Sequence, residues 1–244
     1  MTAFTLKIIA TASMLTDHVG VVFDVPAVFR GIGRIAFPIY AFMIAQGCVH
    51  TKNINRYLAR LGIFAIISEI PYDMVFSGKN AAIDFYADVS FLNSTNIFYT
   101  LFLGVACIAL YEKLNTLRIP QVFPGKGENG EVAVGQRLFS LIAVLPPALA
   151  AYALDVDYGV FGVCWIFALY LAGPGNKITR GLVLAAGAVC LYWYSIFYLS
   201  FAIVPVVCVS LYNGKQGPKA KWAFYAFYPV HLAALALAYS ALNW

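Results

Sequence analysis

The chain has 244 residues, of which 62% are apolar and only 11% are charged, and its mean hydropathy is +0.79. No single soluble domain could bury that much apolar surface, so the composition is typical of a polytopic membrane protein. The net charge of +5 does not indicate nucleic acid binding, because the basic residues are scattered over loops and form no stripe with interleaved aromatic residues. We therefore expect one all-α, integral membrane helix bundle over residues 1–244.

Apolar runs follow one another along the chain, several of them close to the roughly 20 residues that a bilayer-spanning helix needs. The first run has no basic n-region and no small-residue cleavage site, so it is expected to remain as a helix and not to be removed as a signal peptide. The stretch 178–212 either breaks into two short helices at its aromatic cluster or continues as one long tilted helix. With the break, nine helices are predicted at 5–24, 31–49, 58–77, 96–114, 138–154, 158–173, 178–194, 196–212 and 222–242.

Basic residues are distributed unevenly between the two sets of loops. Lys and Arg collect on the cytoplasmic side of a membrane. The N-terminal stretch and the even-numbered loops hold thirteen of the 16 Lys and Arg residues, which leaves only Arg30, Arg34 and Lys79 for the other side. This bias predicts a cytoplasmic N-terminus and an outer C-terminus, in agreement with an odd number of helices.

Ionisable residues stand inside the first predicted helix, where a charge at membrane depth is costly and therefore indicates a functional site. Lys7 and His18 are eleven residues apart. On a helix this spacing returns to nearly the same angle and rises about 16 Å, so both residues share a face with Met14. Asp17 points about 100° away from His18 and cannot easily orient it. If His18 is a base, another helix should supply its orienting partner.

The second predicted helix opens with two arginines and contains a proline. Arg30 and Arg34 form an i,i+4 pair near the expected outer surface, and the helix runs inward to His50. Pro38 removes a backbone hydrogen bond, so we expect it to kink or start the helix.

The third predicted helix carries a carboxylate at membrane depth. It begins at Arg60 on the expected inner side and reaches Glu69 well inside the membrane. A carboxylate there needs a partner or a proton. By estimated depth, Arg34 and His18 are the nearest partners that the sequence offers to Glu69.

Two further predicted helices place polar groups on single faces. Asn96 and Thr100 share a face of the fourth helix, and Tyr228 and His231 share a face of the ninth. A lone buried histidine is more often structural than catalytic, and tyrosines near helix ends are usually interfacial anchors. The polar residues nevertheless gather in helices 1, 2, 3 and 9, while helices 5 to 8 are nearly bare.

Two classes of membrane protein need such a polar core: a transporter of charged solutes, and an enzyme that joins reactants arriving from opposite sides. A proton-coupled transporter or flippase often repeats its helix groups and broken helices in both halves of the chain. Here the polar residues have no counterpart in the second half, which favours an enzyme. A transporter of the same architecture and a non-catalytic assembly factor remain alternatives. No metal is expected, because the five cysteines and the histidines lack ligand spacing.

Several motifs in the same order resemble the TraX family. They cover about the first hundred residues and the last helix. The matching residues are Lys7 to Ala10, Met14, Asp17-His18 and Gly20; Arg30-Gly-Ile-Gly-Arg34-Ile-Ala-Phe-Pro38 with Phe42, Gly47 and His50-Thr51; Tyr57, Arg60-Leu61, Phe64-Ala65, Ser68 and Pro71; and Phe224-Tyr225 with Tyr228-Pro-Val-His231-Leu.

The resemblance implies an activity. The TraX family takes its name from a protein that acetylates the N-terminus of pilin, and it is similar to the acyltransferase-3 class, in which a basic residue and a histidine with Lys7–His18 spacing mark the first helix. Lys7 stands where that class carries arginine, so a bidentate grip would be lost. The resemblance implies an acyltransferase in a bacterial-type cytoplasmic membrane. It would transfer acetyl from cytoplasmic acetyl-CoA to an outer amine or hydroxyl, on a peptide N-terminus such as that of a pilin or on an envelope sugar.

This reading gives each polar residue an expected role. His18 is the expected general base, with Asp17 or Glu69 holding charges in place. Hydrogen bonds to the developing oxyanion or the substrate are expected from Arg34, Asn96, Thr100, Tyr228 and His231. The donor is expected to contact Lys7, His50, Arg60 and Lys221.

Overall fold

The computed structural model describes residues 1–76, 95–117, 134–173 and 175–242. Within these ranges the regular secondary structure is helical, the helices are joined by turns and loops, and one isolated bridge links Thr95 and Val156. The helices are α1 (Ala3–Val22), α2 (Val28–Gly33), α3 (Ala36–His50), α4 (Ile54–Phe76), α6 (Ile97–Thr116), α7 (Val134–Ser140), the 3₁₀ helix η1 (Leu141–Val144), α8 (Leu145–Ala153), α9 (Gly159–Leu171), α10 (Lys177–Tyr192), α11 (Ile196–Ala202), α12 (Val204–Ser210) and α13 (Lys221–Leu242).

Each of the nine predicted segments corresponds to a helix or to a run of consecutive helices. The predicted second helix is divided into α2 and α3 by a turn at Arg34 and Ile35, and Pro38 lies in the first turn of α3, where a missing N–H costs little. The stretch 178–212 is two helical arms, because α10 ends at Tyr192 and α11 begins at Ile196. The sequence left that choice open, and the structure decides it.

Several helices begin at side chains that cap their free backbone N–H groups. A cap oxygen accepts a hydrogen bond that the first turn of the helix cannot make internally. The capping side chains are Thr2 for α1, Asn96 for α6, Asn176 for α10 and Ser195 for α11. These caps fix where the helices start.

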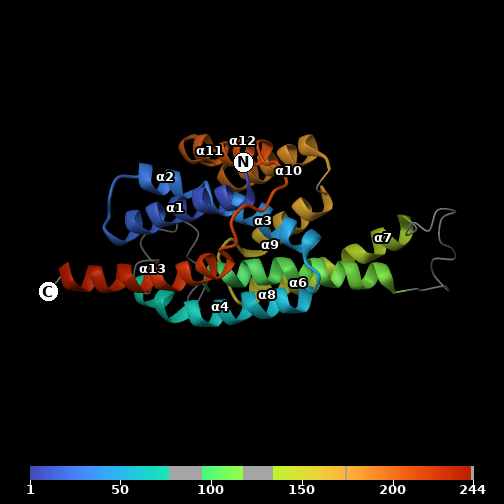
Figure 1. Cartoon of the computed structure of the whole chain (residues 1–244), viewed down its shortest axis with the longest axis horizontal. Helices are drawn as coiled ribbons and strands as arrows, with labels where there is room; N and C mark the ends of the chain where they lie inside the picture. Colours follow the sequence, from blue (N-terminus) through green and yellow to red (C-terminus); the bar gives the residue numbers. More distant parts are fainter. Residues whose placement is uncertain (77–94, 118–133, 174, 243–244) are drawn as a thin grey trace.

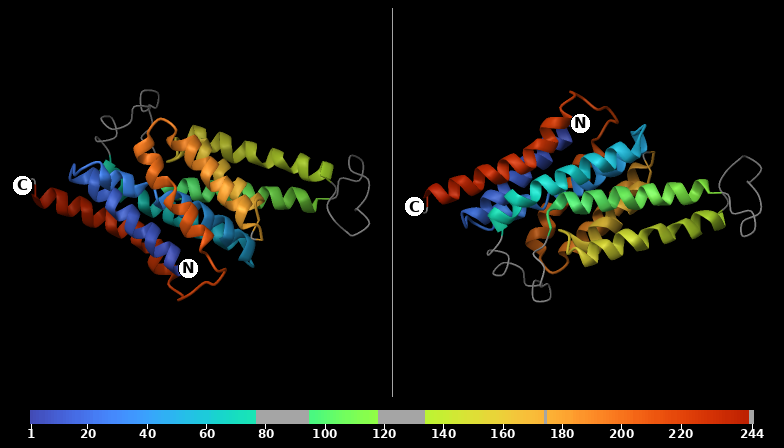
Figure 2. Two further views of the ribbon diagram at one scale, coloured as in Figure 1. Left: turned by 90° about the horizontal axis from the view of Figure 1, so that it is seen from above. Right: turned by 90° about the horizontal axis from the view of Figure 1, so that it is seen from below.

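Figure 1 shows α10, α11 and α12 along one edge of the bundle and α4, α6 and α13 along the opposite edge, with α1, α3 and α9 between them. Helix α13 packs on α4 and on α1, although nearly the whole chain separates it from α1 in sequence. The two views in Figure 2 show α1 and α13 running side by side. The first and last helices are therefore neighbours, which brings their polar faces together.

Among the residues that the structure describes, four helical stretches are long and apolar enough to cross a membrane: Val28–His50, Ile97–Thr116, Gly135–Ala153 and Lys221–Leu242. Helices α1 and α4 are as long, but α1 carries Lys7, Asp17 and His18, and α4 carries several charged residues. Helices α1 and α4 are therefore less apolar than the four candidate spans because they carry polar residues that the sequence analysis identified. The number of crossings and their orientation stay predictions, and Lys79, Arg118 and Lys126 of the charge count lie outside the described residues.

The first turn of α1 is tied to the segment that precedes α13. The backbone N–H of Ala3 donates to the carbonyl of Lys215 at 2.8 Å, and that of Phe4 donates to the carbonyl of Gln216 at 3.0 Å. Gly217 adopts a left-handed φ of 72°, and an added Cβ there would lie 2.9 Å from the Thr2 hydroxyl. A glycine is needed at this close approach.

Candidate functional site

Two buried histidines meet between α1 and α13. His18 Nδ1 lies 2.7 Å from His231 Nε2, and His231 Nδ1 lies 2.8 Å from the carbonyl oxygen of Phe227. His18 is 9% exposed and His231 is 6% exposed. The sequence predicted that a different helix would supply the orienting partner of His18, and the structure places His231 there. His231, whose expected contact with the substrate stays a prediction, forms a hydrogen bond with His18.

Aromatic rings enclose the histidine pair. The ring centroid of Phe76 from α4 lies 5.4 Å from that of His18, and the ring of Tyr228 lies 6.0 Å from His18 and 5.5 Å from His231. Phe227 stacks on His231 at 4.6 Å. The pair is thus held in an aromatic cage contributed by two helices, α4 and α13, which packs against both rings.

Asp17, the neighbour of His18, faces α2 and forms ion pairs. Its Oδ1 lies 3.0 Å from a guanidinium nitrogen of Arg30 and 3.6 Å from one of Arg34. The Arg34 guanidinium also lies over the rings of Tyr192 and Tyr198, at 5.8 and 5.3 Å. Asp17 therefore neutralises part of the charge of two arginines and does not contact His18, as the helical angle between the two residues predicted.

A cavity of about 750 Å³ opens between the start of α1, the end of α3, and the starts of α4 and α13. All four residues that the sequence assigned to the acyl donor line it: Lys7, His50, Arg60 and Lys221. Lys219 adds another cation. Basic side chains from four segments thus converge on one cavity at one end of the bundle, although they are far apart in sequence.

Several of these basic groups retain hydrogen-bonding capacity. Lys7 lies 5.6 Å above the ring of Phe224. Arg60 lies over Tyr57, and its buried Nε has no hydrogen-bond partner among the residues that the structure describes. His50 uses Nδ1 to reach the carbonyl of Gln46 at 2.8 Å, so that contact leaves its Nε2 unused. The cavity wall can therefore donate to an anionic ligand without first breaking an ion pair.

The inner end of the cavity reaches the histidine cage but not the histidines themselves. Met14 and Tyr228 line it, while His18 and His231 do not. Met14 is one helical turn before His18, and Tyr228 touches both imidazole rings. Tyr228 accordingly forms part of the wall between the basic cavity and the pair.

The expected partners of Glu69 were wrong. Its carboxylate accepts hydrogen bonds from the side-chain amide of Asn96 and, at 3.4 Å, from the backbone N–H of the same residue. Asn96 is the N-cap of α6, so the contact joins α4 to α6. Arg34 instead pairs with Asp17, and His18 with His231. Depth along the membrane normal, from which these partners were chosen, carries no information on which helices are lateral neighbours.

Two of the expected oxyanion donors have hydrogen bonds inside the fold. The amide of Asn96 also donates to the carbonyl of Ala65 at 2.8 Å, and the hydroxyl of Thr100 donates to the carbonyl of Asp157. Neither side chain lines the cavity, and neither does Arg34. Of the five residues assigned to this role, Tyr228 lies on the cavity wall.

Sequence reasoning missed several cavity residues. Tyr40, whose hydroxyl lies 2.8 Å from that of Thr11, lines the cavity, as do Gln46 and Tyr57. A Cβ on Gly47 would lie 2.7 Å from the Tyr57 hydroxyl, so this glycine makes room for the phenol. The spacing of Tyr57 and Arg60, three residues apart on α4, could have indicated that both face the same cavity.

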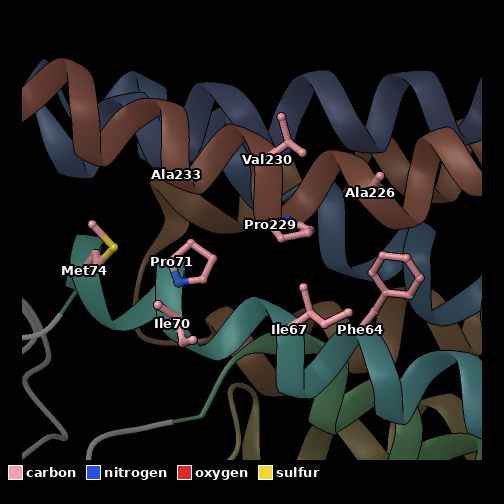
Figure 3. A pocket seen from close by; sticks show the side chains of 9 residues that line it. All are labelled: Phe64, Ile67, Ile70, Pro71, Met74, Ala226, Pro229, Val230 and Ala233. Atoms are coloured by element: carbon pink, nitrogen blue, oxygen red, sulfur yellow. The ribbon is translucent and has the colours of Figure 1, made fainter.

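A second hollow lies between α4 and α13 and is lined by apolar side chains (Figure 3). Its residues include Ile67, Pro71, Pro229 and Val230, and it carries no group able to perform acid–base chemistry. Within the described ranges, no group of three or more His, Cys, Asp or Glu side chains is placed to hold a metal ion.

Comparison with known proteins agrees with the motifs on α1 to α4 and α13. The family described as TraX protein matches residues 3–238. This chain belongs to the TraX family. A relative from Dichelobacter nodosus, named "Probable fimbrial assembly protein FimC, serogroup H1", is 31% identical over 255 residues, which cover 96% of this chain and 93% of that protein. No solved structure matches. The TraX assignment holds along nearly the whole chain, including the middle, where the sequence alone had offered hydrophobicity.

Proposed function

We propose that this TraX-family protein is a membrane acetyltransferase that moves an acetyl group from acetyl-CoA to an amine or hydroxyl. One observation carries the proposal: a cavity of about 750 Å³ with cationic walls extends to a tyrosine that touches a buried, hydrogen-bonded histidine pair. A cationic entrance suits a phosphate-bearing donor, and a buried imidazole suits proton transfer near neutral pH.

The residues of the cavity fit such a donor. Lys7, His50 and Arg60, with Lys219 and Lys221, supply positive or donor groups for the phosphates of the nucleotide. Further in, the wall is formed by apolar and aromatic side chains such as Leu61, Phe98 and Leu101, which suit the pantetheine arm. The predicted cytoplasmic position of this end of the bundle would place it where acetyl-CoA is available.

The acceptor comes from the opposite direction in this proposal. The name of the relative, a probable fimbrial assembly protein, favours a peptide N-terminal amine on a fimbrial subunit such as a pilin. An envelope sugar that carries an amine or hydroxyl is the other acceptor of matching chemistry. A proton must leave either group as it attacks, so both require a base.

His18 would serve as that base. The acceptor nitrogen or oxygen attacks the thioester carbonyl carbon, and its proton passes to the His18 imidazole. The tetrahedral intermediate then collapses with cleavage of the carbon–sulfur bond, and the departing thiolate takes the proton from His18 to leave as the CoA thiol. Tyr228, which lies on the cavity wall beside His18, would donate a hydrogen bond to the oxyanion.

The test uses the full-length protein in lipid nanodiscs with isotope-labelled acetyl-CoA. The acceptors are a peptide with a free N-terminus, the same peptide with a blocked N-terminus, and an amino sugar, and the products are read by mass spectrometry. His18→Ala should lower kcat by about 10²- to 10⁴-fold, the usual contribution of a general base. Ile8→Ala, on the exposed side of the same helix, is the matched control and should leave the rate unchanged.

Two results would overturn the proposal. One is acetyl transfer by His18→Ala at the wild-type rate. The other is proton-coupled solute uptake into vesicles that contain the wild-type protein and no acyl donor, without acetyl transfer to any of the acceptors. The second result would favour a transporter of the same architecture.

A further inference from the structure

The hydrogen bonds of His231 determine which of its nitrogens carries a proton. Its Nδ1 lies 2.8 Å from the backbone carbonyl of Phe227. A carbonyl oxygen only accepts hydrogen bonds, so Nδ1 of His231 must be the donor and must be protonated. In the neutral ring, Nε2 then holds a lone pair and is an acceptor.

The tautomer of His231 determines that of His18. Its Nδ1 faces that lone pair at 2.7 Å, so it must carry the hydrogen of the bond. The two ring planes differ by 7° and their centroids are 5.0 Å apart, so a nitrogen–nitrogen contact of this length places the rings edge to edge, as an in-plane N–H···N bond requires. His18 is left with an unprotonated Nε2.

The surroundings favour the neutral form of both rings. Burial among aromatic side chains disfavours a charged imidazole. The carboxylate nearest in sequence, Asp17, is held by Arg30 and Arg34, which are themselves cations. Two adjacent imidazolium ions would also repel each other. A neutral chain running from His18 through His231 to the carbonyl of Phe227 satisfies each of these conditions.

We propose that His231 is a positioning residue: it accepts the Nδ1 hydrogen of His18, fixes that ring in one tautomer, and thereby makes Nε2 of His18 the basic nitrogen. A carboxylate performs this task in serine proteases, where loss of the correct tautomer lowers kcat about 10⁴-fold. Here a neutral histidine performs it, which avoids placing a second charge beside Asp17 and its arginines. The catalytic consequence rests on the proposed acetyl transfer, whereas the tautomer does not.

The chain has only three histidines, and the structure assigns a protonated Nδ1 to all of them. His50 Nδ1 lies 2.8 Å from the carbonyl of Gln46, so it too must be protonated at Nδ1. Ring nitrogen-15 chemical shifts distinguish protonated from bare nitrogens. The full-length protein labelled with ¹⁵N-histidine and reconstituted in lipid should therefore give protonated Nδ1 signals for all three histidines, and bare Nε2 signals for the buried pair His18 and His231.

Two substitutions at the same position separate the hydrogen bond from the shape of the ring. His231→Gln supplies an amide oxygen that can accept from His18 Nδ1, whereas His231→Phe keeps an aromatic ring between Phe227 and His18 but has no acceptor. The ¹⁵N spectrum should show His18 still protonated at Nδ1 in His231→Gln. In His231→Phe the proton should leave Nδ1 or exchange between both nitrogens. Leu237→Phe, on the exposed side of the same helix, is the control and should leave the spectrum unchanged.

Steady-state kinetics of the two His231 variants provide a second test. His231→Phe should lower kcat by about 10²-fold with the KM for acetyl-CoA unchanged, since the donor cavity is not lined by His231. His231→Gln should retain kcat to within about tenfold of the wild type. A purely structural role of His231 would make both variants lose activity together with stability.

The outcomes are distinct. A wild-type spectrum with His18 protonated at Nε2, or a His18 tautomer unaffected by His231→Phe, overturns the positioning role. Equal losses of kcat in the Gln and Phe variants also overturn it. If the wild-type protein acetylates none of the acceptors, the proposed function fails, and the spectra alone still decide the tautomer.

Discussion

Helix α1 buries polar residues in two ways at almost the same depth, one on each side. Toward α2, Asp17 forms ion pairs with two arginines and neutralises part of their charge. Toward α13, His18 and His231 form a chain of neutral hydrogen bonds that ends at a backbone carbonyl. In the first arrangement the carboxylate is paired with the arginines, whereas the second leaves one imidazole nitrogen, Nε2 of His18, unused. Adjacent residues on α1 therefore face different helices and differ in the hydrogen-bonding capacity that their contacts leave unused.

The largest effect on folding is expected from the charged side. Asp17→Asn keeps the shape of the side chain but leaves Arg30 and Arg34 partly buried without a carboxylate, which should lower the free energy of unfolding by about 3 kcal/mol. Denaturation in mixed micelles measures this loss. The double variant with Arg34→Gln should recover part of it, since one uncompensated cation is then removed. Simple addition of the two losses would contradict the pairing.

A smaller loss of stability is expected when a steric clash pushes the same ion pairs apart without removing a charge. A Cβ added to Gly33 would lie 2.3 Å from the carboxylate carbon of Asp17, so Gly33→Ala must push the carboxylate away from its arginines. We expect a loss of about 2 kcal/mol in the free energy of unfolding, typical of overpacking. Gly62→Ala is the matched control, because its Cβ would make an ordinary 3.5 Å contact with Phe102. Equal stabilities of the two variants would argue against a close Gly33–Asp17 contact.

On the face of α1 that packs against α13, by contrast, a substitution should alter the binding of acetyl-CoA and not the stability of the fold. Lys7→Met removes a cation from the cavity wall and should raise the KM for acetyl-CoA by about tenfold, within the range of a charge-assisted hydrogen bond. The free energy of unfolding and kcat should stay unchanged, and Lys7→Arg should restore the KM. An unfolding defect without a change in KM would instead assign Lys7 to the fold.

The sequence was sufficient for the helices and for four basic residues of the cavity, Lys7, His50, Arg60 and Lys221. Long apolar runs identify helices directly, and the shared face of Lys7, Met14 and His18 follows from helical periodicity. The contacts between helices were harder to predict, because hydropathy indicates how deep a residue lies in the membrane but not which helices are neighbours. Glu69 was therefore assigned to Arg34 and His18 although it binds Asn96. The contact of His18 with His231, which is 213 residues away, was not predicted for the same reason.

The choice between one and two helices at 178–212 shows another limit. Aromatic residues in mid-run are compatible with both, and hydropathy does not change sharply there. The break becomes visible only through the local backbone, where the hydroxyl of Ser195 accepts a hydrogen bond from the N–H of Tyr198 and starts α11. A cap of this kind is a short signal, and one serine is too common a residue to be decisive from sequence.

The backbone tie between Ala3, Phe4 and the Lys215–Gln216 segment has a mechanical consequence. It joins the N-terminal end of α1 to the segment that leads into α13, so the two helices that carry the histidines are connected at one end. From this joint to the imidazole contact, α1 extends about 21 Å and α13 about 15 Å, taking 1.5 Å per residue. A small rotation at the joint would be magnified at the far contact into a displacement comparable with a hydrogen bond. The alignment of His18 with His231 would therefore respond to a change at the opposite end of the cavity, where the donor is proposed to enter.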